Sequence, residues 1–166
     1  MPDLTPQERL QPSLLDRLTD DKPDVKQEPR EARVMSLKKL REAVVRDLVW
    51  LLNAGNFEDS CDLSNFPHAA RSVLNYGMPD LSGCTASSID VSEMERILRQ
   101  CIWDFEPRIL RNTVKVRVLI GEHMNRNALT FEIEGELWAE PVPDHLFLKT
   151  ELDLETGNVT IEERAG

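Results

Sequence analysis

Hydrophobic positions follow helical spacing over the first two thirds of the chain and strand spacing over the last third. Between residues 33 and 54, apolar side chains recur at steps of three and four, which predicts an amphipathic helix. The apolar stripe of this helix consists of Leu37, Leu40, Val44, Leu48, Leu51 and Leu52. The run Asn53-Ala54-Gly55-Asn56 follows it, and such residues are typical of the left-handed conformation that ends helices.

A second helix is predicted from Phe66 to Tyr76. Asn65 is suited to be its N-cap, Pro67 fits the first turn, and Gly77 is a stop. Residues 78–88 then form a loop that contains a proline and a glycine.

A third helix is predicted from about Asp90 to Phe105, where Pro107 breaks the pattern. Ser92 and Glu95 have the spacing of a capping box. The expected buried stripe consists of Val91, Met94, Ile97, Leu98, Cys101 and Phe105.

From Asn112 the hydrophobic period changes from 3.6 to 2, which predicts strands. Alternating runs cover residues 114–120, 129–140 and 146–155, and a turn at 156–158 leads to a fourth strand, Val159 to Glu162. Such alternation is typical of an antiparallel sheet with one buried and one exposed face. The predicted fold class is therefore α+β, with N-terminal helices packed on one face of a C-terminal antiparallel, roughly four-stranded sheet.

Residues 1–30 are rich in proline and contain one short apolar cluster, which spans residues 12–18. Leu14, Leu15 and Leu18 lie on one side of a two-turn helix there. A helix this short is unstable alone, so it docks either on its own domain or on a partner. We therefore divide the chain into a leader, 1–30, and a single domain, 31–166.

The net charge is −10, from 20 basic and 30 acidic residues, and it disfavours binding to nucleic acid or to anionic membranes. No apolar run approaches the ~20 residues that span a bilayer. The first residues have no apolar stretch of the kind found in signal peptides, so we expect a cytoplasmic protein with no direct membrane insertion.

The acidic residues concentrate near the C-terminus, where residues 129–166 hold ten acidic and two basic residues. Lys115, Arg117 and Lys149 can pair across strands with part of the row Glu132, Glu134 and Glu136. The remaining carboxylates form either a solvated face or a surface that meets a basic partner strand.

Residues that carry chemistry show no known arrangement. Phosphate-binding loops, nucleophile elbows and HExxH motifs are absent, and the three histidines lack companions at ligand spacing. Cys61, Cys84 and Cys101 form no CxxC pair, and we expect them to be reduced. The sequence therefore predicts no catalytic residue, no metal site and no cofactor.

One enzymatic alternative is glycoside hydrolysis by paired carboxylates, with Glu106 as the acid and Asp104 or Glu122 as its partner. Residues 104 and 106 point to different sides of a helix end, and the aromatic residues do not cluster into a platform for a sugar. This reading stays the weaker one.

Three segments together carry a family resemblance: residues 12–18, Phe105-Glu106-Pro107-Arg108, and residues 129–153. Residues 46–53 and 72–77 match as well. The chain resembles the TssE family of type VI secretion baseplate subunits, which is similar in turn to the lysozyme-like wedge protein of contractile phage tail baseplates. The resemblance covers about residues 12–162 and implies a lysozyme-like baseplate wedge domain that is not hydrolytic.

The resemblance implies specific partners. They are the wedge subunits TssF and TssG, TssK nearby, and the sheath subunits TssB and TssC, whose first ring the family is thought to template. The chain is expected to be monomeric by itself. The alternatives are a peptidoglycan hydrolase and a soluble adaptor outside secretion.

Three groups of residues are candidates for these contacts. Glu106, Pro107 and Arg108, here called the corner, are expected to project two charges and hold the wedge subunits, or else to pair internally. Leu14, Leu15, Arg17 and Leu18 form the candidate docking helix, and Val159, Thr160 and Ile161 form the candidate edge strand for the sheath.

Overall fold

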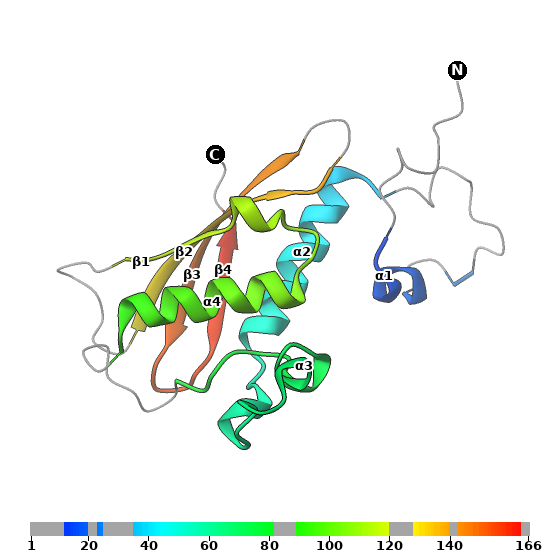
Figure 1. Cartoon of the computed structure of the whole chain (residues 1–166). Helices are drawn as coiled ribbons and strands as arrows, with labels where there is room; N and C mark the ends of the chain where they lie inside the picture. The colour runs from blue at the N-terminus through cyan, green and yellow to red at the C-terminus, as the bar shows by residue number, and fades with distance from the viewer. Residues whose placement is uncertain are drawn as a thin grey trace.

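The protein folds into two main helices packed on one face of an antiparallel sheet. The computed structural model describes residues 12–19, 23–24, 35–81, 89–119, 128–139 and 143–163. The sheet has four strands in the order β1-β2-β3-β4, with β1 Lys115–Leu119, β2 Ala128–Leu137, β3 Asp144–Asp153 and β4 Val159–Glu163. Figure 1 shows α2 and α4 together on one side of the strands. The α+β prediction is confirmed.

Alternation along the strands decides which side chains face the helices. Leu129, Phe131 and Ile133 of β2 are buried, whereas Glu132 and Glu134 between them are only partly covered. The same alternation in the neighbouring strands directs their buried side chains to the same face, so the core lies between the sheet and the helices. It runs from Met35 before the first long helix to Val159 in β4.

Helix α2, Leu37–Leu52, contacts β4 and contributes six buried residues to the core. Ser36 caps its first turn by accepting a hydrogen bond from the Lys39 amide. Its predicted stripe is buried except for Leu37, the first residue of the helix, which is exposed. The helix ends at Asn53 with a negative φ, so the predicted left-handed ending is wrong.

Helix α4, Val91–Phe105, crosses the same face and contacts β1. The predicted capping box does not form, because the Asp90 side chain caps the helix by accepting from the amides of Ser92 and Glu93. Glu95 instead accepts a hydrogen bond from the Val118 amide of β1 at 2.9 Å.

The single helix predicted over 66–76 is wrong, because the chain there forms α3, Pro67–Ala70, and the short 3-10 helix η4, Val73–Asn75. Buried Asn75 explains the break. Its side-chain oxygen accepts from the Glu58 amide, beside the 3-10 helix η3, Phe57–Asp59, and its amide nitrogen donates to the carbonyl of Ala70. Gly77 follows with φ 125°, a conformation that favours glycine.

Candidate interaction site at the corner, the leader helix and the sheet edge

The corner forms where α4 ends and the chain turns towards the sheet. Glu106 is the C-cap residue of α4, and the backbone of Arg108 accepts a hydrogen bond from the Trp138 amide just after β2. A further short helix, η5 Arg111–Thr113, leads from the corner into β1. The corner is thus fixed between the end of α4 and the end of β2.

Glu106 does not project from this corner, because its side chain is only 4% exposed. Its carboxylate accepts hydrogen bonds from Nε and Nη2 of Arg108 and from the Arg108 backbone amide. The guanidinium of Arg108 therefore neutralises a buried carboxylate through a bidentate contact. Of the two expectations for the corner, the structure shows the internal pairing.

The same guanidinium reaches a second acid on α2. Arg108 Nη2 donates to Asp47 Oδ2 at 2.6 Å, and the side chain of Arg108 is 23% exposed. Burial lowers the pKa of Arg108, but the hydrogen bonds and charges of Glu106 and Asp47 outweigh it and raise the pKa above its usual value. Nη1 of Arg108 is buried and has no hydrogen-bond partner among the described residues.

The ionic contacts continue from Asp47 to the leader helix. Arg46 Nε donates to Asp47 Oδ1 at 2.8 Å, and Arg46 Nη1 donates to Asp16 Oδ1 at 2.7 Å. Five side chains thus form one network that joins the leader to the corner: Asp16, Arg46, Asp47, Arg108 and Glu106. Two arginines and three carboxylates leave this ionic network with a net charge of −1.

Helix α1, Leu14–Leu18, is the candidate docking helix and lies beside α2, apart from the sheet (Figure 1). Ser13 caps it by accepting from the Asp16 amide. None of its residues is buried, and Leu14 and Leu18 are 72% and 74% exposed. Its acidic side chain contacts the domain, whereas its apolar side chains and Arg17 face solvent.

The candidate edge strand is β4, whose three predicted residues differ in what their backbones contact. Val159 donates its amide to Asn53 Oδ1 and accepts from Asn53 Nδ2 at its carbonyl, both at 2.9 Å. Thr160 lies opposite Glu151 of β3, and Ile161 lies opposite Thr150. Asn53 therefore occupies the outer side of the strand at Val159.

Local spacing does not predict the roles of Asp16, Arg46, Asp47 and Asn53 in this site. The only local signal is that Arg46 and Asp47 are adjacent on an amphipathic helix. Their partners lie far away in the sequence, because Asp16 is 30 positions from Arg46 and Arg108 is 61 positions from Asp47. Separations of that length are set by tertiary packing rather than by local spacing.

Catalytic and metal-binding arrangements do not emerge among the described residues. Asp104 accepts a hydrogen bond from Gln100, Glu106 is hydrogen-bonded to the guanidinium of Arg108, and Glu122 lies outside the described part of the chain. No group of three His, Cys, Asp or Glu side chains could hold a metal ion within the described ranges.

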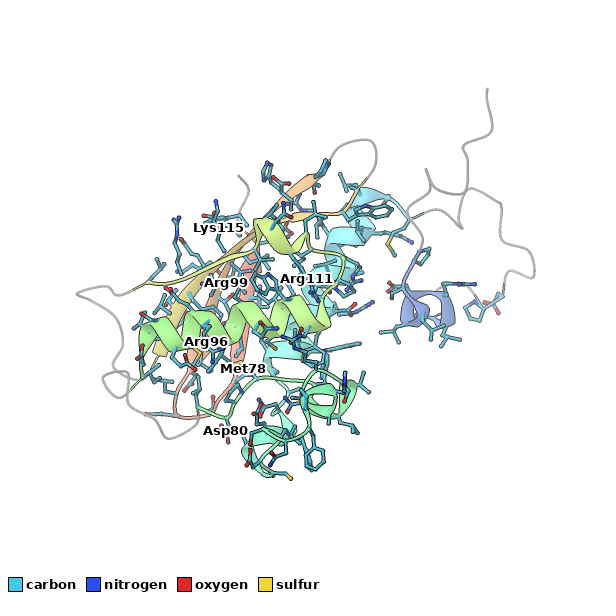
Figure 2. The ribbon with its side chains drawn as sticks, in the orientation of Figure 1. Met78, Asp80, Arg96, Arg99, Arg111 and Lys115 are labelled. Atoms are coloured by element: carbon cyan, nitrogen blue, oxygen red, sulfur yellow. The ribbon has the colours of Figure 1, made fainter. Side chains whose placement is uncertain are left out.

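Four basic side chains outside the ionic network lie on α4 and around the start of β1. Figure 2 shows Arg96 and Arg99 on α4, Arg111 in η5, and Lys115 as the first residue of β1. Arg96 pairs with Glu93 on its own helix, and Lys115 pairs with Glu134 across the strands at 3.6 Å. None of the helices in the described part of the chain has the length and apolar character needed to cross a membrane.

Comparison with known proteins gives one match. The model of the family described as baseplate wedge protein gp25 matches residues 38–142, which is more than half of the chain. The match includes nearly all of α2, the whole of α4, the corner, β1 and β2, and it excludes α1, β3 and β4. Neither the curated proteins nor the solved structures contain a match. The resemblance to baseplate wedge proteins that the sequence motifs indicated is thus confirmed, and the chain belongs to the family of the baseplate wedge protein gp25, a structural component of phage-tail-like baseplates.

Proposed function

We propose that this chain is a non-enzymatic wedge subunit of a type VI secretion baseplate that bridges the wedge subunits to the contractile sheath. In this role it works in the cytoplasm, binds TssF and TssG close to TssK, and presents its sheet to TssB and TssC as a template for the first sheath ring. The family match, which spans the corner, carries the proposal. By itself the chain is a monomer, with a leader over 1–30 and a wedge domain over 31–166.

The corner supports this role through its rigidity and its partly exposed guanidinium. Glu106 and Asp47 hold the guanidinium of Arg108 in one position, and the side chain is 23% exposed. An acceptor on a wedge subunit, such as a backbone carbonyl or a carboxylate, can meet this accessible part. Pro107 beside it is exposed and adds an apolar contact of fixed conformation.

The leader helix supports the role through its orientation. A five-residue helix that buries no side chain gains little from its own domain, yet here Asp16 is held by Arg46 while Leu14 and Leu18 are exposed. That orientation suits an apolar groove on a neighbouring subunit, into which Leu14 and Leu18 would insert.

The test is capture of this chain by co-expressed TssF and TssG. Wild type is expected to be retained, and Arg108→Lys, which keeps the charge near Glu106 but lacks the guanidinium, is expected to lose retention with a similar melting temperature. Leu14→Ser combined with Leu18→Ser should weaken retention, because both side chains are exposed in the free protein. Arg71→Lys, a change at the exposed arginine that directly follows α3, is the matched control.

Failure of wild type to bind TssF and TssG would contradict the proposed function. Equal retention of Arg108→Lys and wild type would leave a wedge role in place but remove the corner from the contact.

A further inference from the structure

Four large apolar side chains are exposed on the short helices that follow α2. Phe57 lies in η3, Phe66 directly precedes α3, and Val73 and Leu74 lie in η4. They are 50%, 61%, 83% and 70% exposed, in that order. Together they present apolar surface on the order of 400 Å², the size of exposed patches that often bind partners. These four residues are here called the apolar patch.

The helices that carry the apolar patch are joined by tertiary contacts. Both η3 and α3 contact η4. Buried Asn75 of η4 accepts a hydrogen bond from the Glu58 amide of η3 and donates one to the carbonyl of Ala70 in α3. Figure 1 shows α3 beyond the C-terminal end of α2. The patch is therefore carried by one cross-linked segment, 56–80, and not by separate loops.

This segment is attached to the domain by residues other than the apolar patch. Leu63 and Met78 are buried, and the Met78 amide donates to the carbonyl of Ala54, just after α2, at 2.9 Å. The exposed side chains of the patch add little to folding, because most of their apolar surface stays in contact with water. A partner that covers them gains that burial energy in full.

Acidic residues surround the apolar patch in the sequence and decide which partner fits. Residues 56–80 contain four acidic residues and one basic residue, a local charge of 1 − 4 = −3. The carboxylates of Glu58, Asp59 and Asp62 are exposed and accept hydrogen bonds only from uncharged groups among the described residues. Because no described cation pairs with them, a basic partner is attracted to this segment.

We infer that the apolar patch binds an amphipathic helix of another protein, whose apolar face covers the patch and whose lysine or arginine side chains meet the acids of η3. A helix fits better than a strand, because backbone amides of the segment are used within it. The Ser60 amide donates to Phe57, and the Asn75 amide donates to Ser72. Recognition therefore depends on side chains, as it does where a helix binds an apolar surface. This contact goes beyond the proposed function, since it uses no residue of the corner, of α1 or of β4.

Two other occupants fit the charge less well. A second copy of this chain would bring together two segments of like charge on molecules that each carry −10. An anionic membrane surface would be repelled by the same acids. Both remain distinguishable outcomes of the experiment.

The test uses the full chain labelled with 15N and a synthetic peptide of leucine and lysine with helical spacing, about 18 residues or five turns long. Amide shift changes are expected within residues 57–74. Val73→Ser combined with Leu74→Ser should weaken binding at least tenfold without lowering the Tm, because both side chains are exposed. Leu14→Ser combined with Leu18→Ser removes two similarly exposed leucines from α1 and should leave binding unchanged.

Charge and amphipathicity have their own controls. Glu58→Lys should weaken binding several-fold, whereas Asp24→Lys, the same charge change in the leader, should not. A peptide with glutamate in place of lysine, and a scrambled peptide without an apolar face, should each bind at least tenfold more weakly than the amphipathic lysine peptide.

Equal binding of the scrambled peptide, or unchanged binding by the Val73 and Leu74 double variant, would overturn the inference. So would binding to phospholipid vesicles in place of the peptide, or self-association in sedimentation that the same double variant abolishes. The changes at Leu14 and Leu18 are expected to weaken capture by TssF and TssG but not peptide binding. Failure of the inference and failure of the proposed function are therefore distinguishable.

Discussion

Asp16 of α1 accepts a hydrogen bond from Arg46 of α2 at 2.7 Å, and this contact is the one ion pair that α1 makes with the domain among the described residues. The leader helix is therefore held against the domain by an ion pair and not by apolar packing. Arg46 also contacts Asp47, and Asp47 contacts Arg108, so two shared side chains connect the leader helix to the corner.

Removing this ion pair should release α1 without unfolding the domain. Asp16→Ala is expected to change the free energy of unfolding by less than about 1 kcal/mol, since the pair is partly exposed. Proteolysis within residues 14–18 should become several times faster. Asp24→Ala, which removes an exposed acid from the leader, is the matched control and should change neither quantity.

The contact between α1 and the domain should also depend on pH, and it should weaken only at low pH. Burial raises the pKa of Asp16, but its hydrogen bonds with Ser13 and Arg46 outweigh it, so the pKa is lowered from its usual value. Because the pKa of Asp16 is lower in the folded protein, its ionised carboxylate stabilises the contact of α1 with the domain at any pH above its unfolded pKa. This contribution is lost as the pH falls through the pKa that Asp16 has in the folded protein. Backbone relaxation of α1 should stay constant between pH 5 and pH 8, values well above the ordinary aspartate pKa of about 3.9, and should show increased mobility below about pH 4. Increased mobility already at pH 6 would contradict this assignment.

Removal of the arginine at the corner should destabilise the fold itself. Arg108→Ala leaves the buried carboxylate of Glu106 without its partner, and breaking such a pair costs about 3 kcal/mol. For a chain of this size, that cost lowers the Tm by roughly 10 °C in thermal unfolding. Arg71→Ala, at an exposed arginine, should leave the Tm within about 1 °C of wild type. Equal Tm values for the two variants would show that the pairing at the corner contributes little.

The two glycines beside the end of α2 should respond differently to alanine. At Gly77 a Cβ would lie 2.2 Å from the carbonyl oxygen of Ala54, and φ is 125°, so Gly77→Ala should destabilise by more than about 2 kcal/mol. At Gly55 nothing lies within 4 Å of the added Cβ and φ is not positive, so Gly55→Ala should be neutral or stabilising by up to about 1 kcal/mol. Chemical denaturation of the two variants measures this contrast directly.

The two described cysteines should differ in reactivity. Burial, with a smaller contribution from the charge of Asp104, raises the pKa of the Cys101 thiol to about 12, and this thiol donates to the carbonyl of Gly77. Cys61 is exposed. Mass spectrometry after brief alkylation of the native protein should find Cys61 modified and Cys101 protected, with both modified after denaturation. Early modification of Cys101 would contradict its burial.

Local spacing was sufficient to predict most of the fold. Alternation from residue 114 onwards predicted all four strands, and it correctly directed Phe131 and Ile133 to the core. Spacing of three and four did the same for α2 apart from Leu37. In α4 it correctly predicted the burial of Met94, Leu98 and Cys101, but it missed buried Ile102, and Val91, Ile97 and Phe105 are only partly buried. These patterns succeed because the spacing of apolar residues along a helix or a strand depends only on which of its faces packs against the core.

The site could be predicted only in part, because its contacts depend on residues distant in sequence. The motif at 106–108 was identified, but the burial of Glu106 depends on packing against α2, and Asp47 lies 61 residues away from Arg108. Asn75 similarly breaks the expected helix through bonds to Glu58 and Ala70, which no local pattern indicates. Glu95 has capping-box spacing, yet it binds β1 because that strand packs beside α4.

Charged residues on the exposed face give the sheet two unlike ends. Arg117 of β1 lies opposite Glu132 of β2, Glu132 lies opposite Lys149 of β3, and Lys149 lies opposite Glu162 of β4. This charge row therefore begins with a basic residue at β1 and ends with an acidic residue at β4. A strand with a basic side chain at this row is attracted to the β4 edge and repelled at the β1 edge, and a strand with an acidic side chain shows the reverse. Strands that extend the sheet at β4 and strands that extend it at β1 therefore require opposite charges at this position.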